Sequence, residues 1–146
     1  MPKLIKYLDF PLLAVPIMVL QSKNNNQQRD KTMNNRVYIC SPYSGDVEAN
    51  VKLAREFSAY ALGFDVMPIA PHLLFPQFMD DKVPSERQQA MAFNRQIFDG
   101  CSELWVLLGE RGISHGMEVE IGWAEREGKA MRYFSVNGGK FFEIIY

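Results

Sequence analysis

The feature that most constrains the fold is the way short apolar runs alternate with longer amphipathic segments after residue 35. Residues 36–40 and 104–108 are short and almost wholly apolar, a pattern typical of strands buried on both faces of a sheet. Segments with apolar residues at helical spacing separate these runs. A strand–helix–strand order implies right-handed crossovers between parallel strands.

This order predicts an α/β fold of the flavodoxin or Rossmann type, an open parallel sheet of four to five strands with helices on both faces. Strands are expected at residues 36–40, 64–69, 104–108, 130–134 and, as the fifth, 141–146. Helices are expected from 47, from 85 to about 100, and from 117 to 127. Asp46 and Ser85 are suited to cap two of them, and Gly63 to end the first in a left-handed conformation.

Residues 1–34 do not share this pattern. The apolar stretch at 10–20 is too short to cross a bilayer, which needs about 20 apolar residues, and it contains two prolines. Residues 21–31 are rich in Asn, Gln and charge, which indicates a linker. We expect a flexible appendage at 1–34 and one α/β domain at 35–146. Met33 is a candidate for the native start, which the intact mass of the protein from its host would test.

Composition excludes some classes of partner. A net charge of −1 gives no electrostatic reason to expect a nucleic-acid polymer or an acidic membrane. Cys40 and Cys101 are expected to be reduced core thiols, and the spacing of His72 and His115 suggests no metal site. We therefore expect a cytoplasmic protein without a metal or a cofactor.

Unusual residues gather in three loops that leave the carboxyl edge of the predicted sheet, at 41–45, 70–84 and 109–116. Ligands bind at that edge in open α/β sheets. The loop at 70–84 has three prolines and no period, which is typical of a functional loop. The candidate substrate-binding residues are Ser41, Pro42, Tyr43, Gly45, Asp46, His72, Ser114, Gly116 and Met117. An ordinary turn capped by Asp46, and a histidine satisfied by loop backbone, explain individual residues as well.

The last loop leads into a helix that carries Glu118 and Glu120. Backbone N–H groups at a helix start attract anions and favour an ionised carboxylate. The two glutamates are two residues apart, so they face different sides of the helix. Gly122 leaves room for a backbone or a ligand beside Glu120. An ionised carboxylate that faces a pocket is suited to attack an anomeric carbon, although solvated glutamates would fit these residues equally well.

Two segments, Tyr38-Ile-Cys-Ser-Pro-Tyr43 and Gly116-Met-Glu-Val-Glu-Ile-Gly-Trp-Ala124, resemble the nucleoside 2-deoxyribosyltransferase-like superfamily. The chain is more similar to a mostly uncharacterised phage and bacterial branch, which has Ser-Pro-Tyr, Ala-Pro-His-Leu, Glu-Leu-Trp-Val and Ile-Ser-x-Gly-Met segments. The resemblance covers about residues 36–134 and is more specific for fold than for activity. It implies that Glu120 is the nucleophile and that Tyr38 lies beside it.

Two positions depart from the family pattern. Ser114 stands where the family usually has an aspartate, two residues before Gly116. Ser102-Glu103 stands where an aspartate tends to precede the third strand, so Glu103 is a candidate substitute. Because a hydroxyl does not hold charge as a carboxylate does, we expect altered substrate choice, hydrolysis in place of transfer, or no turnover.

The leading hypothesis is N-glycosidic chemistry on a nucleoside or nucleotide, either deoxyribosyl transfer or hydrolysis. Glu120 would attack C1′, and Tyr38 would orient its carboxylate. The alternatives are a non-catalytic nucleotide-binding module of phage or prophage origin, and an interaction protein with a vestigial pocket. The resemblance also implies a homodimer or larger homo-oligomer. The base, sugar and phosphate state stay open.

Overall fold

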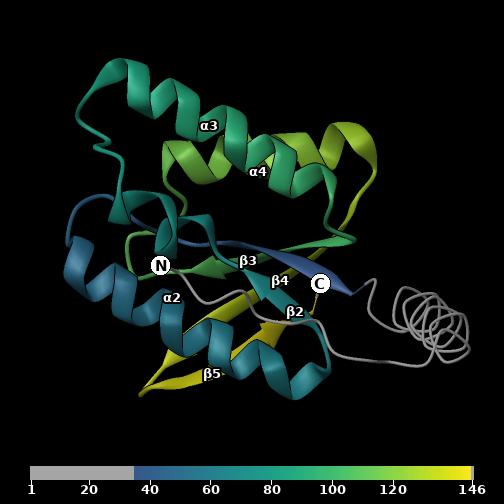
Figure 1. Ribbon diagram of the computed structural model, residues 1–146. Helices are drawn as coiled ribbons and strands as arrows, with labels where there is room; N and C mark the ends of the chain where they lie inside the picture. Colours follow the sequence, from purple (N-terminus) through teal and green to yellow (C-terminus); the bar gives the residue numbers. More distant parts are fainter. Residues whose placement is uncertain (1–34, 146) are drawn as a thin grey trace, which may run out of the picture. The chain divides into compact units, whose positions relative to one another are not determined.

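A sheet of five strands in the order β2-β1-β3-β4-β5 lies at the centre of residues 35–145, the part of the chain that the computed structural model describes (Figure 1). The expectations for residues 1–34 lie outside that part. The strands are β1 (Arg36–Cys40), β2 (Met67–Ile69), β3 (Glu103–Leu108), β4 (Ala130–Asn137) and β5 (Lys140–Ile144). The helices are α2 (Val47–Ala61), α3 (Pro84–Asp99) and α4 (His115–Glu127).

Strands β2, β1, β3 and β4 are parallel, which confirms the predicted open sheet. Strand β5 differs, because it pairs antiparallel with β4. The reason is local: Gly138 and Gly139 both have positive φ, at 56° and 75°. A two-residue turn with two positive φ angles joins only antiparallel neighbours.

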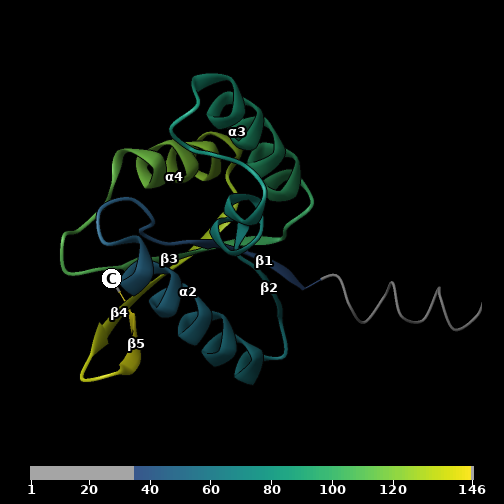
Figure 2. The same ribbon diagram turned by 60° about the vertical axis from the view of Figure 1, so that its left-hand side comes forward.

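Helices cover both faces of the sheet, as predicted (Figure 2). Side chains alternate along β1, so Val37 and Ile39 pack with Phe57 of α2 on one face. Tyr38 and Cys40 point to the other face, where they join the buried residues of α3 and α4. These are Phe98, Met117, Ile121 and Ala124. Both faces of the central strands are therefore covered, which explains their continuous apolar runs.

Several predicted boundaries are wrong, each for a local reason. Gly63 does not end α2 in a left-handed conformation, because residues 62–64 form a 3₁₀ turn and Asp65 takes the positive φ of 56°. That turn also shortens the second strand from residues 64–69 to Met67–Ile69. Ser85 does not cap α3, which begins one residue earlier at Pro84, a residue that suits the first helical turn.

The predicted long loop connects β2 to α3 and contains two short 3₁₀ turns, Pro71–Leu73 and Phe75–Gln77. We call residues 70–83 the cover loop. The connections from β1 and from β3 lead to helices on opposite faces of the sheet, α2 and α4. In such sheets this point between neighbouring strands, beyond their carboxyl ends, is where ligands bind. No helix among the described residues is long and apolar enough to span a membrane.

Candidate functional site

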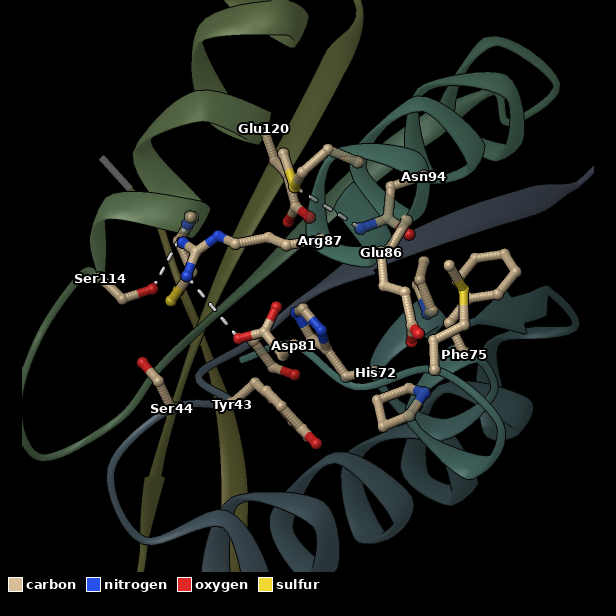
Figure 3. Close-up of a pocket in the computed structure, with 18 of the residues that line it drawn as sticks. Tyr43, Ser44, His72, Phe75, Asp81, Glu86, Arg87, Asn94, Ser114 and Glu120 are labelled. Carbon is tan, nitrogen blue, oxygen red and sulfur yellow. Dashed lines mark hydrogen bonds and ion pairs between the residues drawn. The ribbon is translucent and has the colours of Figure 1, made fainter. Parts of the chain in front are cut away.

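A cavity lies beyond the carboxyl ends of the central strands, between the cover loop and helices α3 and α4 (Figure 3). Its volume of about 120 Å³ is several times the ~10–15 Å³ that one water needs. The lining residues are Ser41, Tyr43 and Ser44 after β1; Pro71, His72, Phe75, Pro76, Met79, Asp80 and Asp81 in the cover loop; Glu86, Arg87, Ala90, Met91 and Asn94 on α3; and Ser114, Gly116, Met117 and Glu120 at α4.

Glu120 lies on the inward face of α4, because buried residues recur there at helical spacing at 117, 120, 121 and 124. Its side chain is only 2% exposed. The hydroxyl of Tyr38 donates to Glu120 Oε1 over 2.7 Å, and Oε2 has no hydrogen-bond partner. Glu118 is exposed and its carboxylate lies 3.4 Å from His115 Nδ1. The two glutamates therefore face different sides of the helix, as their spacing predicts.

Burial raises the pKa of Glu120 from 4.5 to about 7, against the opposing effect of hydrogen bonds from Tyr38 and Cys40. We expected the helix start to hold this carboxylate ionised. Glu120 lies six residues after the cap Ser114, and the effect of a helix terminus falls off within its first turn. Desolvation therefore dominates, and near neutral pH the carboxyl is divided between its two protonation states. Burial also raises the pKa of Tyr38 and of Cys40.

Three buried polar atoms among the described residues have no hydrogen-bond partner: Ser41 Oγ, Asn94 Oδ1 and Glu120 Oε2. All three residues line the same cavity, although they come from the loop after β1, from α3 and from α4. An unsatisfied buried polar group costs about 1–3 kcal/mol, and native proteins hold few of them. Their concentration at one cavity makes it the place where a polar ligand or an ordered water would supply the missing partners.

The cover loop brings an imidazole to this cavity. The ring of His72 stacks on Tyr43, with 5.3 Å between ring centroids and 16° between planes. Burial lowers the pKa of His72, while the charge of Asp81 and a backbone hydrogen bond at Ser41 act in the opposite direction. His72 is therefore neutral near pH 7 and suited to hydrogen bonding. Arg87 lies 3.7 Å from Asp81 at the exposed rim, an ion pair expected to contribute little stability.

Besides Tyr38, the sequence predicted ten site residues. Seven of these ten line this cavity: Ser41, Tyr43, His72, Ser114, Gly116, Met117 and Glu120. Pro42, Gly45 and Asp46 line a neighbouring cavity instead. Asp46 caps α2 by accepting from Ala49 N over 3.1 Å, the ordinary role that its position allowed. Gly45 has a φ of 95°, and a Cβ there would lie 2.8 Å from Arg111 Nη1.

The positions that depart from the family pattern have structural roles. Ser114 caps α4, with its Oγ accepting from Met117 N over 3.3 Å. Glu103 begins β3, at the opposite edge of the sheet from the cavity, and accepts from Trp105 Nε1 over 2.7 Å. It does not replace a carboxylate at the site. Gly122 does not line the cavity, and a Cβ there would meet Arg126 at 3.4 Å, so no other backbone approaches it.

Sequence reasoning missed Asn94, which is 5% exposed and lines the cavity from α3. One signal was present in the sequence. Asn94 lies four residues before the buried Phe98 and four after Ala90, so it is a polar residue within an apolar helical stripe. Among the described residues, no three His, Cys, Asp or Glu side chains lie close enough to hold a metal ion. Both cysteines are free and buried.

The fold is similar to those of two solved deoxyribosyltransferase structures. It is similar to the 2-deoxyribosyltransferase from the psychrotolerant bacterium Bacillus psychrosaccharolyticus, with a TM-score of 0.59 and 16% identity over 76% of this chain and 77% of that one. It is also similar to the 2-desoxiribosyltransferase from Leishmania mexicana, with a TM-score of 0.52 and 20% identity over 70% of this chain and 65% of that one. The described residues thus have a deoxyribosyltransferase-like α/β fold.

The chain belongs to the family described as "Domain of unknown function (DUF7768)", whose model matches residues 35–134. That range ends in β4, so it contains every residue that lines the cavity. No curated protein matches the chain.

Proposed function

We propose that the protein cleaves or transfers the N-glycosidic bond of a nucleoside or nucleotide, with Glu120 as the nucleophile. One observation carries the proposal: Glu120 Oε1 is held by Tyr38 at 2.7 Å, while Oε2 is buried, unpartnered and at the cavity. A retaining enzyme needs one carboxylate oxygen free to reach the anomeric carbon. The similarity of the fold to 2-deoxyribosyltransferases supports the same substrate class.

The proposed reaction has two displacements. Glu120 Oε2 bonds to C1′ as the C1′–N bond breaks. The electron pair of the C1′–N bond leaves with the base, and the base takes a proton from water. Water or a second base then attacks C1′ as the C1′–Oε2 bond breaks, and the attacking group loses its proton to solvent. This step restores the carboxylate and retains the configuration at the sugar. Tyr38 keeps its hydrogen bond to Oε1 throughout and so fixes which oxygen attacks. Neither step needs a metal or a cofactor.

The test is base release from deoxynucleosides and their 5′-monophosphates, followed by chromatography. Wild type should release base, and Glu120→Gln should be inactive although it stays folded. Glu118→Gln is the matched control, because it changes an exposed carboxylate two residues away on the same helix. Addition of a second free base should yield a new nucleoside if the enzyme transfers, and only free sugar if it hydrolyses. Undiminished base release by Glu120→Gln would refute the mechanism.

A non-catalytic nucleotide-binding module, of phage or prophage origin, is the second candidate. The other acidic side chains at the cavity favour this candidate, because they already have partners at the rim of the cavity. Asp81 lies near Arg87, and Glu86 accepts from the backbone N–H of Asp80. Neither is placed as a free acid for a leaving base. A ligand-induced rise in the melting temperature without base release by any substrate would support this candidate over the enzyme.

We also propose that the protein assembles as a homodimer or larger homo-oligomer. Exposed apolar side chains support this, among them Phe78 at 66% and Phe142 at 51% exposure. Light scattering coupled to size exclusion tests it, and a monomer at all concentrations measured would refute it.

A further inference from the structure

The cavity contains a polar side chain that the proposed mechanism does not use. Asn94 reaches the cavity from α3, while Glu120 reaches it from α4 (Figure 3). Its Oδ1 is buried without a partner, and its Nδ2 has only a weak contact with Met91 Sδ at 4.0 Å. The amide is thus held in the cavity wall with almost all of its hydrogen-bonding capacity unused.

A sugar hydroxyl fits this amide, because it can donate and accept at once. A hydroxyl donates to Oδ1 and accepts from Nδ2, so it satisfies Asn94 in either orientation of the amide. Ser41 Oγ, unpartnered at the same cavity, is suited to a further polar group of the same ligand. Glu120 lines the same cavity, which would hold the anomeric carbon of that sugar.

The hydrogen bond from Tyr38 to Glu120 limits which atoms of the cavity can bind a hydroxyl of the sugar. In retaining glycosidases, the sugar 2-hydroxyl forms a hydrogen bond that strengthens in the transition state. Here the Tyr38 hydroxyl already occupies Glu120 Oε1 at 2.7 Å, and Oε2 is reserved for attack. A ring hydroxyl near the reacting carbon must therefore find its partner outside the nucleophile. Among the unpartnered atoms, the acceptors that are left are Asn94 Oδ1 and Ser41 Oγ, and Asn94 also offers the N–H donors of its amide beside that oxygen.

We propose that Asn94 is a specificity-determining residue that recognises a ring hydroxyl, at C2′ or C3′, of the sugar bound at this cavity. The inference rests on the proposed function, because it takes the ligand to be a nucleoside or nucleotide. It predicts that sugars lacking that hydroxyl leave Asn94 unsatisfied. A site built to bind a hydroxyl rejects the analogue that lacks it far more strongly than an apolar pocket does.

The test compares one base on three sugars: ribose, 2′-deoxyribose and 3′-deoxyribose. Dissociation constants are measured by calorimetry, and kcat/KM wherever base is released. Wild type should prefer one hydroxyl-bearing sugar over its deoxy analogue by about tenfold or more. The analogue that is rejected identifies the hydroxyl. In Asn94→Leu the preference should fall to within about threefold, through weaker binding of the hydroxyl-bearing sugar alone.

Two variants keep the result interpretable. Asn94→Leu replaces an unsatisfied amide by an apolar group of similar size, so its melting temperature should not fall. Asn94→Ala tests the same loss of preference without filling the space. Gln89→Leu, an amide-to-leucine change at an exposed position of α3, should leave both affinity and preference unchanged. A merely structural asparagine would lower stability and leave the preference intact.

Each outcome separates this inference from the proposed function. A preference that depends on Asn94 without base release would support the recognition role and refute the glycosidic chemistry. Base release with the same preference in Asn94→Leu as in wild type would refute the recognition role alone. Equal weakening of all three sugars would also overturn it. If no sugar of the panel binds the wild-type protein, both ideas fail.

Discussion

The hydroxyl of Tyr38 donates to Glu120 Oε1 over 2.7 Å, joining a strand and a helix that are 82 positions apart in the chain. Because Tyr38 is fully buried beneath the cavity, this hydrogen bond fixes the carboxylate from the core side. The arrangement leaves a single carboxylate oxygen for a ligand. It also makes the pKa of Glu120 depend on Tyr38, whose hydrogen bond opposes the effect of burial.

Tyr38→Phe should raise the pKa of Glu120 above about 7, because the lost hydrogen bond lowers it in the wild type. The pH at which activity rises should move upward, since the nucleophile acts only when ionised. Carbon NMR of labelled glutamate side chains measures the shift even without turnover. Tyr60→Phe, on the opposite face of the sheet, is the control. An unchanged or lower pKa in Tyr38→Phe contradicts this prediction.

Glu120→Gln should change how stability depends on pH. Burial raises the pKa from 4.5 to about 7, so the folded state binds the proton more tightly than the unfolded state. The resulting stabilisation is complete below about pH 4.5 and is lost as the pH rises through about 7. Relative to wild type, the variant should gain about 3 kcal/mol in unfolding free energy between about pH 4 and pH 8.

Urea unfolding at a series of pH values measures that difference, and Glu118→Gln serves as the exposed control. A difference between Glu120→Gln and wild type that stays constant with pH would show that the carboxyl has an ordinary pKa in the fold.

Ser114→Ala should destabilise the protein by about 1 kcal/mol, because it removes the cap of α4. Ser114→Asp should keep most of that stability, since aspartate accepts the same backbone hydrogen bond. Denaturant unfolding of both variants provides the measurement. If Ser114→Ala were as stable as wild type, the hydrogen bond at 3.3 Å to Met117 N would have no capping value.

The imidazole of His72 should titrate below 6.5, because its burial disfavours the charged form. Asp81→Asn should lower the pKa further, since the charge of Asp81 opposes the shift. Proton–nitrogen NMR across pH measures both, and His115→Asn assigns the two imidazole signals. A midpoint above 6.5 in the wild type would show that Asp81 outweighs desolvation.

The sequence predicted the bounds of an element well where the apolar pattern depends directly on burial. Strand β1 begins and ends where its apolar run predicts, and Gly128 ends α4 with a positive φ of 65°. Local glycine and serine signals were weaker. Gly63 and Ser85 lie within one or two residues of helix ends, yet neighbouring residues supply the turn and the start. Such choices differ by less than the packing energy of a helix, so tertiary structure decides them.

For the site, too, some features could be predicted from the sequence and others could not. The three loops were predicted because parallel strands place their carboxyl ends at one edge. Asn94 was not predicted as a site residue: its place in an apolar helical stripe indicates burial, but whether it reaches a cavity depends on how α3 lies against α4. The raised pKa of Glu120 was also missed, since desolvation is a property of the assembled core.

The prolines of the cover loop have a consequence for how a ligand enters. Pro71 and Pro76 lie in its two 3₁₀ turns, and a third proline, Pro84, follows the loop directly and begins α3. Each proline fixes one backbone dihedral angle, so the segment has little freedom to lose on association. Recognition should then rest on shape already present in the empty protein, with little induced fit. Replacing Pro71 or Pro76 with glycine would weaken affinity even with every polar contact in place, through the lost rigidity and through the loss of ring atoms that line the cavity.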